Sequence, residues 1–272
     1  MKYIVAVSGG VDSMVLLDML SKLPNHELIV AHFDHGIRAE SADDAAFVSR
    51  AATRYGLPFF TKREELGSGA GEALARERRY AFLNELAKQH QAKIVTAHHL
   101  DDLVETVTIN MIRGTGWRGL AVLDADIARP LVDTPKSALV DYADRHGILW
   151  QEDATNTTNA YLRNRVRPKT SVLLLDTKRQ IRALHAHQKQ LKREIESEVK
   201  AIVGAGPTYS RYLFTHLQTP VALESLRVIT KGALTRPQLA RLLHAIKVHA
   251  GSSVYEAGNG INAHFTTRHF SL

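Results

Sequence analysis

The chain begins with an apolar run, a glycine-rich loop and a helical pattern in direct succession. Residues 3–7 are apolar and typical of a buried strand, and the next six residues read Ser-Gly-Gly-Val-Asp-Ser. Leu16, Met19, Leu20 and Leu23 then recur at helical spacing. A strand that stops at paired glycines and continues as a helix leaves backbone N–H groups unpaired at the positive end of the helix dipole. The natural partner of such a loop is a phosphate group.

The six loop residues are suited to holding an anion. The paired glycines lack Cβ atoms and let a ligand approach the backbone, while the two serines add hydroxyl donors. The Gly-Lys-Ser/Thr ending of a Walker loop and the Gly-x-Gly-x-x-Gly pattern are both absent. An ordinary glycine turn explains Ser-Gly-Gly alone, but not the full strand, loop and helix. The loop resembles that of the PP-loop ATP pyrophosphatases, which implies an ATP site made of Ser8, Gly9, Gly10, Val11, Asp12 and Ser13.

The composition narrows the class of protein. The chain has no cysteine, which excludes disulfides, thiolate-bound zinc, iron–sulfur clusters and persulfide chemistry. Its hydrophobic content of 44% is typical of a globular protein. No stretch approaches the ~20 apolar residues of a membrane helix, and Gly9 and Gly10 interrupt the apolar start before it could serve as a signal peptide. We therefore expect a cytoplasmic protein with no membrane partner.

The formal charge of +7 is unevenly distributed. Residues 1–162 carry a net charge of −5, residues 163–200 carry +7, and residues 201–272 carry +5. An acidic first part joined to a basic second part suits an enzyme that handles a polyanion such as RNA. A solvated, lysine-rich helix explains part of the middle segment equally well.

Short β-rich runs alternate with longer helical patterns, which predicts an α/β fold with a doubly wound parallel sheet. A long polar helix over 179–203 then ends at a Gly-Ala-Gly-Pro sequence, and a small α+β domain follows it. That domain is predicted to hold a helix over 235–250 and a hairpin around Gly258 and Gly260. We expect a catalytic domain over 1–170, a linking helical region over 171–206 and a small C-terminal domain over 207–272, whose basic charge suits binding of RNA. The predicted strands are 3–7, 28–33, 57–61 and 93–97. The predicted helices of the first domain are a segment capped by Ser41 that ends before Gly56, 72–90, 100–112, and a helix with Pro135 at its first position that stops at Gly147.

Two further clusters of polar residues follow predicted strands, at the edge where ligands of parallel sheets bind. Asp34 and His35 follow the second strand, and His98 follows the fourth. Taken singly, Asp34 is more simply explained as a turn residue, and each histidine as a hydrogen-bonded polar group, than as part of a ligand site.

Acidic and basic side chains gather farther along the chain. Asp101, Asp102 and Glu105 open the predicted helix over 100–112. Asp102 and Glu105 are three residues apart and so on one face, where the two carboxylates could hold Mg²⁺ or a cationic amine. Complementarity to the helix dipole is the alternative explanation for these acids. The basic residues suited to nucleotide or RNA phosphates, which could also be plain surface charges, are Arg76, Arg79, Arg113, Arg163 and Arg167.

In order, these motifs closely resemble those of the tRNA(Ile)-lysidine synthetases, over residues 1–168. The resemblance implies that ATP adenylates C2 of the wobble cytidine of a CAU-bearing tRNA(Ile), releasing pyrophosphate. Free L-lysine then attacks C2 and expels AMP. The motifs are the loop at 8–13, His-Phe-Asp-His-Gly-Ile-Arg-Ala-Glu-Ser at 32–41, Ala-Arg-Glu-Arg-Arg-Tyr at 75–80, Thr-Ala-His-His-Leu-Asp-Asp-Leu-Val-Glu-Thr at 96–106, Arg-Gly-Thr-Gly at 113–116, Arg-Pro-Leu at 129–131, and Glu-Asp at 152–153 with Arg163, Asn164 and Arg167.

The resemblance also implies roles for individual residues. Asp102 and Glu105 would bind the lysine ammonium, Asp34 would accept a proton or orient the nucleophile, and Asp12 would hold Mg²⁺. Arg113 is the fourth predicted catalytic residue, beside Asp34, Asp102 and Glu105. The predicted contacts to tRNA or adenylate are His35, Arg76, Arg79, Arg163, Asn164 and Arg167.

Two other functions remain open from the residues alone. A PP-loop amidating ligase would use ammonia on a small adenylated substrate and would not need a basic tail. A nucleotide-binding module without activity would leave Asp34, Asp102 and Glu105 without a purpose. Residues 234–272 resemble the family's first C-terminal domain, so we expect a short form of the family, in which a homodimer is possible.

Overall fold

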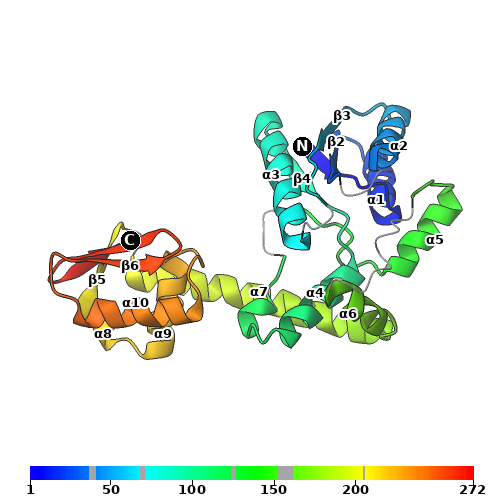
Figure 1. Cartoon of the computed structure of the whole chain (residues 1–272). Helices are drawn as coiled ribbons and strands as arrows, with labels where there is room; N and C mark the ends of the chain where they lie inside the picture. The colour runs from blue at the N-terminus through cyan, green and yellow to red at the C-terminus, as the bar shows by residue number, and fades with distance from the viewer. Residues whose placement is uncertain (37–40, 68–70, 124–126, 152–161, 205) are drawn as a thin grey trace. The chain divides into compact units, whose positions relative to one another are not determined.

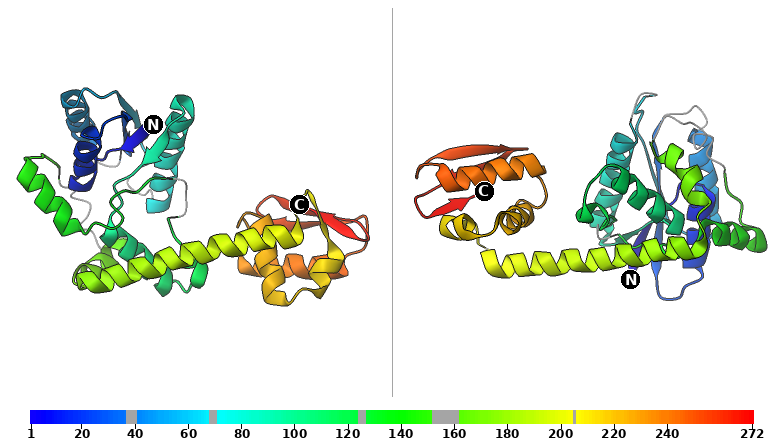
Figure 2. Two further views of the ribbon diagram at one scale, coloured as in Figure 1. Left: turned by 180° about the vertical axis from the view of Figure 1, so that it is seen from behind. Right: turned by 90° about the horizontal axis from the view of Figure 1, so that it is seen from below.

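The computed structural model describes residues 1–36, 41–67, 71–123, 127–151, 162–204 and 206–272. The chain forms two compact units, which we call unit 1 (Met1–Lys189) and unit 2 (Gln190–Leu272). The division falls within α7 (Leu175–Val203), a continuous helix in both views of Figure 2. The three-part division at residues 170 and 206 stays a prediction.

Unit 1 is built on a four-stranded parallel sheet with the strand order β3-β2-β1-β4. In register, Ile4 of β1 lies opposite Ile29 of β2 and Ile94 of β4. The fourth strand also forms a parallel bridge from Val95 to Ala128. All four strands were predicted to within two residues or so at each end, and they are β1 (Lys2–Ala6), β2 (Glu27–Asp34), β3 (Phe59–Arg63) and β4 (Lys93–Val95).

Helices cover both faces of this sheet, as Figure 1 shows. Successive residues of β1 face opposite ways, so Val5 enters one core cluster and Ile4 the other. Both are fully buried, as expected for parallel strands covered on two sides. The Val5 side is packed by α1 (Val11–Ser21), α2 (Ser41–Arg54) and α5 (Lys136–His146), and the Ile4 side by α3 (Glu72–His90). The predicted doubly wound α/β fold is confirmed.

Helix boundaries in unit 1 follow local sequence signals. The helix α5 starts after Pro135 and ends at Gly147, whose φ of 61° is the left-handed conformation that glycine favours at a helix end. The bounds of α3 were predicted without error, as were those of α4 (Leu100–Ile112). A short 3₁₀ turn over Trp117–Gly119 and the helix α6 (Leu162–Ser171) complete the described part of unit 1 ahead of α7.

Unit 2 has its own core beneath an antiparallel sheet of order β5-β8-β7-β6. Phe214, Leu226, Leu242 and Phe270 are buried in that core. The predicted helix and hairpin are confirmed, whereas α8 and α9 lie where no element was predicted. The elements are β5 (Thr208–Ser210), α8 (Arg211–His216), α9 (Thr219–Ile229), α10 (Arg236–Val248), β6 (Val254–Gly258), β7 (Ile261–Phe265) and β8 (His269–Ser271). Across the residues described, no helix combines the length and apolarity needed to cross a membrane.

Candidate active site

The Ser-Gly-Gly-Val-Asp-Ser loop joins β1 to α1 at the carboxyl edge of the sheet. Its two serines tie it together, since the Ser13 hydroxyl donates to the Gly10 carbonyl (2.9 Å) and accepts from the Ser8 N–H (3.2 Å). Gly9 has a φ of 95°, which an L-residue with a side chain rarely adopts. Gly10 stands at the cap position of α1, where it has no side chain to accept from the first-turn N–H groups. These groups are therefore suited to an anionic ligand.

Asp12 is the charged residue of this loop. Lys136 Nζ lies 2.6 and 2.7 Å from its two carboxylate oxygens, and His99 Nε2 lies 3.6 Å from Oδ2. Burial raises the pKa of Asp12, but the hydrogen bond to His99 and the charges of His99 and Lys136 outweigh this and hold it below its ordinary value. Asp12 is therefore ionised at neutral pH.

His99 lies between the loop and the acidic helix. Its side chain is 7% exposed, and Nε2 lies 3.4 Å from Asp102 Oδ2. Burial lowers the pKa of His99, but the hydrogen bond to Asp12 and the charges of Asp102 and Asp12 hold it above its ordinary value. The sequence analysis gave His99, the second histidine of the motif at 96–106, no role, because its partners come together only in the fold.

The raised pKa of His99 makes a pH-dependent contribution to stability. The protonated ring is favoured in the folded state, so its contribution is fully present below about pH 6.5, the unfolded pKa, and is lost as pH rises through the folded pKa. We expect the free energy of unfolding to fall with pH across this window and to fall less in His99→Gln. Urea unfolding of both proteins between about pH 6 and pH 9 measures this. Identical pH profiles would contradict the assignment.

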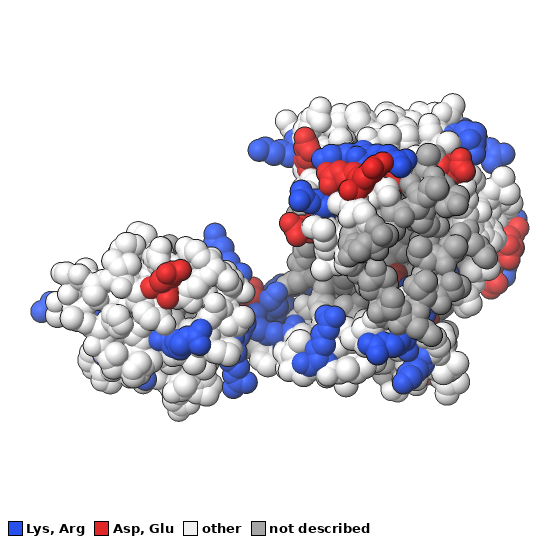
Figure 3. Space-filling model, in the orientation of Figure 1, with Lys and Arg blue, Asp and Glu red and all other residues white. Residues whose placement is uncertain are grey.

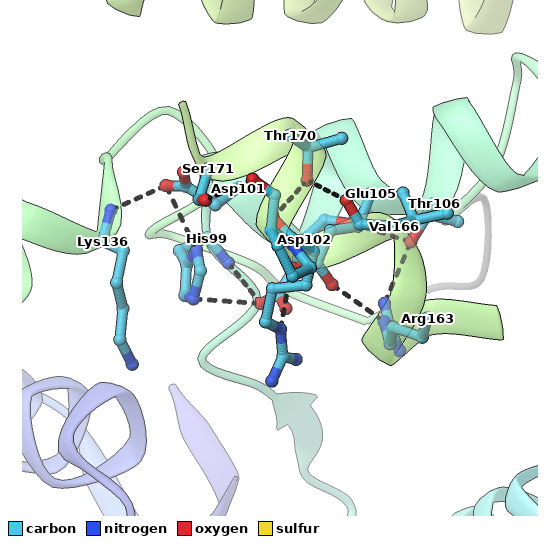
Figure 4. Close-up of polar contacts among 12 residues, drawn as sticks. His99, Asp101, Asp102, Glu105, Thr106, Lys136, Arg163, Val166, Thr170 and Ser171 are labelled. Atoms are coloured by element: carbon cyan, nitrogen blue, oxygen red, sulfur yellow. Dashed lines mark hydrogen bonds and ion pairs between the residues drawn. The ribbon is translucent and has the colours of Figure 1, made fainter. Parts of the chain in front are cut away.

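Asp101 contacts residues near the starts of α5 and α7. It accepts the backbone N–H of Lys136 (2.8 Å) and pairs with Lys178 Nζ (2.6 Å). Burial raises the pKa of Asp101, but these hydrogen bonds from Lys178 and the Lys136 backbone keep it below its ordinary value. Figure 4 shows His99, Asp101, Asp102 and Lys136 grouped at the start of α4.

Glu105 is engaged by two arginines. Arg163 Nε lies 3.1 Å from Oε2, as Figure 4 shows. Arg167 Nε lies 2.9 Å from Oε1, and both arginines belong to α6. Arg163 also donates to Thr106 Oγ1 (3.1 Å). The structure thus brings together three residues that were predicted separately for lysine and for RNA or adenylate. Asn164, half-buried, lies on the same helix.

Of the two acids predicted to bind lysine, Asp102 is the more accessible. Its side chain is 21% exposed, against 4% for Glu105. One Asp102 carboxylate oxygen accepts a hydrogen bond from the backbone N–H of His99 (3.2 Å), which fixes the carboxylate at the start of α4. A cationic amine can approach Asp102 from solvent, whereas at Glu105 it would have to share the carboxylate with two guanidinium groups.

Asp34 is buried at the end of β2. It accepts the Gly36 N–H (2.8 Å) and lies 3.4 Å from Arg63 Nη1. Burial and the charge of Arg79 lower the pKa of the neighbouring His35. The rest of this motif, residues 37–40, lies outside the described residues, as do residues 152–161 with the predicted Glu-Asp pair.

Two of the predicted arginines lie on α3 near His98. The guanidinium groups of Arg76 and Arg79 lie 4.7 and 5.5 Å from the ring centroid of Tyr80. Burial, opposed by the charge of Asp102 and reinforced by the charges of Arg129, Arg76 and Arg79, lowers the pKa of His98 to about 3. His98 is therefore a neutral hydrogen-bonding group.

Arg113 is separated from the other predicted catalytic residues along α4. It follows the last residue of that helix and is exposed. At about 1.5 Å of rise per residue, the 13 residues of α4 put it roughly 20 Å from His99. Its predicted catalytic role therefore requires a substrate that extends along α4, such as RNA.

The loop can take part in holding Mg²⁺. Among the residues that the structure describes, no three His, Asp or Glu side chains cluster to hold a metal ion. The side-chain oxygens that this loop offers are those of the ionised Asp12 carboxylate and of the Ser8 and Ser13 hydroxyls, the latter two lying 3.2 Å apart. Mg²⁺ is commonly held by one or two carboxylates together with substrate phosphates and water, so these residues fit Mg²⁺ that arrives with a nucleotide.

The sheet, the loop and the helix start define an α/β domain whose loop is suited to the phosphate groups of a nucleotide. The family model described as a PP-loop domain matches residues 1–174, and the chain belongs to this family. The U34-tRNA thiolase NcsA from Methanococcus maripaludis has the same fold, with a TM-score of 0.57 and 20% sequence identity. That comparison covers 70% of this chain and 71% of NcsA.

Curated relatives confirm the resemblance stated from the motifs. The tRNA(Ile)-lysidine synthase of Thermus thermophilus is 43% identical over 172 residues, which are 60% of this chain and 34% of that protein. The tRNA(Ile)-lysidine synthase of Exiguobacterium sibiricum is 40% identical over 181 residues, which are 64% of this chain and 43% of that protein. The matched regions thus span less than half of these relatives.

Proposed function

We propose that this protein ligates L-lysine to C2 of the wobble cytidine of a CAU-bearing tRNA(Ile), with conversion of ATP to AMP and pyrophosphate. The observation that supports this most is the 40–43% identity to tRNA(Ile)-lysidine synthases over 60–64% of the chain, beside the PP-loop match over residues 1–174, which contain the loop, Asp34 and the acidic start of α4. The structure places the loop and the acidic helix start side by side, joined by His99.

The first step would adenylate the C2 oxygen of the base. The loop N–H groups and the serine hydroxyls would hold the β- and γ-phosphates and stabilise the charge that develops on pyrophosphate as the bond to the α-phosphorus breaks. Asp12 would help to hold Mg²⁺, which supplies Lewis-acid stabilisation of the phosphate oxygens when bound. His99, protonated, would keep the Asp12 carboxylate in place.

The second step would join lysine to C2 with release of AMP. Asp102 would bind the lysine molecule through an ammonium group, and Asp34 would accept a proton from the attacking amine or orient it. Glu105 would set the position of α6 through Arg163 and Arg167. This assigns lysine binding mainly to Asp102 and gives Glu105 a supporting role.

The basic residues would hold the tRNA. Residues 201–272 carry a net charge of +5, and Figure 3 shows basic side chains at several places on the visible face of unit 2, with little acidic surface. Such charge gives salt-dependent attraction to phosphates. Arg113, Arg76, Arg79 and His35 would contact tRNA or adenylate in unit 1.

The direct test is pyrophosphate release from ATP, measured with tRNA or lysine omitted in turn. We expect release to require a CAU-bearing tRNA(Ile), and lysidine to form only when lysine is present. Pyrophosphate release without tRNA would favour a ligase acting on a small molecule and would overturn the proposal.

Asp102→Asn separates the two steps. The substitution removes the negative partner of the ammonium, worth roughly 1.5–3 kcal/mol for a charged hydrogen bond, so lysine transfer should slow by about 10- to 150-fold. Adenylation should change far less, because ATP is held by the loop. Rapid-quench assays of tRNA adenylation and lysidine formation measure the two steps. Asp141→Asn on α5 serves as a control at an exposed carboxylate, and equal loss of both steps in Asp102→Asn would assign Asp102 to the ATP site instead.

A further inference from the structure

The nucleotide loop has no lysine of its own, yet an ammonium group reaches it from a distant helix. Lys136 is the first residue of α5, and its Nζ lies 2.6 and 2.7 Å from the two carboxylate oxygens of Asp12, the second residue of α1. In Walker loops, a lysine within the loop reaches the terminal phosphates. Here the positive charge belongs to Lys136, which lies 124 residues after Asp12 in the chain.

The backbone of Lys136 is held firmly, while its ammonium is accessible. Asp101 accepts its N–H at 2.8 Å and is itself fixed by Lys178. The side chain points away from Asp101 in Figure 4 and is 41% exposed. The backbone of Lys136 is therefore fixed, while its flexible side chain can move the ammonium group over a short distance.

The charge of Lys136 is not what holds α5 against α1. Leu139 and Ala143 of α5 are buried in the shared core. The Tyr142 hydroxyl donates to Asp18 of α1 at 2.9 Å, again across 124 residues, so a second contact joins the two helices at the same offset. A half-exposed ion pair such as Asp12–Lys136 adds little to this packing.

We propose that Lys136 is a phosphate-binding residue, which turns its ammonium from Asp12 to the β,γ-pyrophosphate portion of ATP when the nucleotide binds. The inference rests on the proposed role of the loop as an ATP site. It predicts that Lys136 distinguishes ligands that carry a pyrophosphate group from AMP, because AMP lacks the phosphates that the ammonium would reach.

Calorimetric binding of ATP, inorganic pyrophosphate and AMP, without tRNA or lysine, tests this in the full-length chain. In Lys136→Met we expect ATP and pyrophosphate to bind about 10- to 100-fold more weakly, the effect of one lost charged hydrogen bond, while AMP affinity stays within about threefold. Lys136→Arg, which keeps the charge, should retain more of the affinity. Tyr142→Phe, which removes the other polar contact between the helices, should leave all three affinities unchanged.

The possible failures are distinguishable. Unchanged ATP and pyrophosphate affinity in Lys136→Met, or an equal loss of AMP affinity, would overturn the inference and leave Lys136 a structural ion pair. The same losses in Tyr142→Phe would show that helix placement matters rather than the ammonium. Failure of the unmodified protein to bind ATP and pyrophosphate would instead overturn the ATP site on which the inference depends.

Discussion

The Asp12→Asn enzyme is expected to release pyrophosphate from ATP on the order of 10²–10³-fold more slowly than the unmodified enzyme. The substitution preserves the shape of the side chain but removes its charge. Lys136 and His99 lose their shared anion, and the loop loses the carboxylate proposed to hold Mg²⁺. Pyrophosphate release in the complete reaction mixture measures the effect, together with the ring pKa of His99 from an NMR titration. The pKa of His99 should fall, because the burial that lowers it is no longer opposed by Asp12.

Asp18→Asn provides a matched control on the same helix. Asp18 accepts hydrogen bonds from Tyr55, Tyr142 and Lys22 and lies outside the loop. Its substitution should lower thermal stability and leave the pKa of His99 unchanged. If Asp12→Asn retained its rate within about threefold, the charge of Asp12 would have no part in the nucleotide chemistry.

Removal of the Glu105 carboxylate is expected to have the largest effect on stability. The side chain is 4% exposed and balances two arginines, so Glu105→Ala leaves two guanidinium groups without their shared anion next to a new cavity. Breaking a buried ion pair by removing one partner costs about 3–5 kcal/mol, and because the two arginine side chains are 23% and 38% exposed, we expect a loss near the lower end, about 3 kcal/mol. Urea unfolding followed by circular dichroism measures the change in the free energy of unfolding.

Two further variants define the cause of this loss. Arg165→Ala replaces an exposed arginine of the same helix and should change the free energy of unfolding by no more than about 0.5 kcal/mol. The double variant Glu105→Ala/Arg167→Ala should be less destabilised than the sum of its single variants, because the ion pair between the two residues is lost only once. Strict additivity would show that Glu105 and Arg167 do not stabilise each other.

Much of the fold could be predicted because local signals set its element boundaries. The alternation of strands and helices predicted the parallel sheet, and Pro135 and Gly147 marked the ends of α5. The helix α8 was missed because six residues are too few to show a helical period, whereas α9 was missed although a proline stands at its start and its buried residues Ala222, Ser225 and Leu226 recur at helical spacing.

The residues of the site could be predicted from the sequence, but the ion pairs between them could not. The loop and the start of α4 were recognised from glycine spacing and from acids in a first helical turn. The partners of Glu105 lie 58 and 62 residues away, and Lys136 was visible only as the residue after a helix-starting proline. Ion pairs between distant segments leave no periodic pattern, so their assignment needed the fold.

The two contacts between α1 and α5 also bear on how the protein is made. Each joins residues 124 positions apart. The entropy lost when the ends of such a segment are brought together grows only with the logarithm of the segment's length. During synthesis, at about 5–20 residues per second, the first helix would wait roughly 6–25 s for its partner to be translated. The loop that is translated first is therefore among the last parts of unit 1 to acquire its full set of contacts.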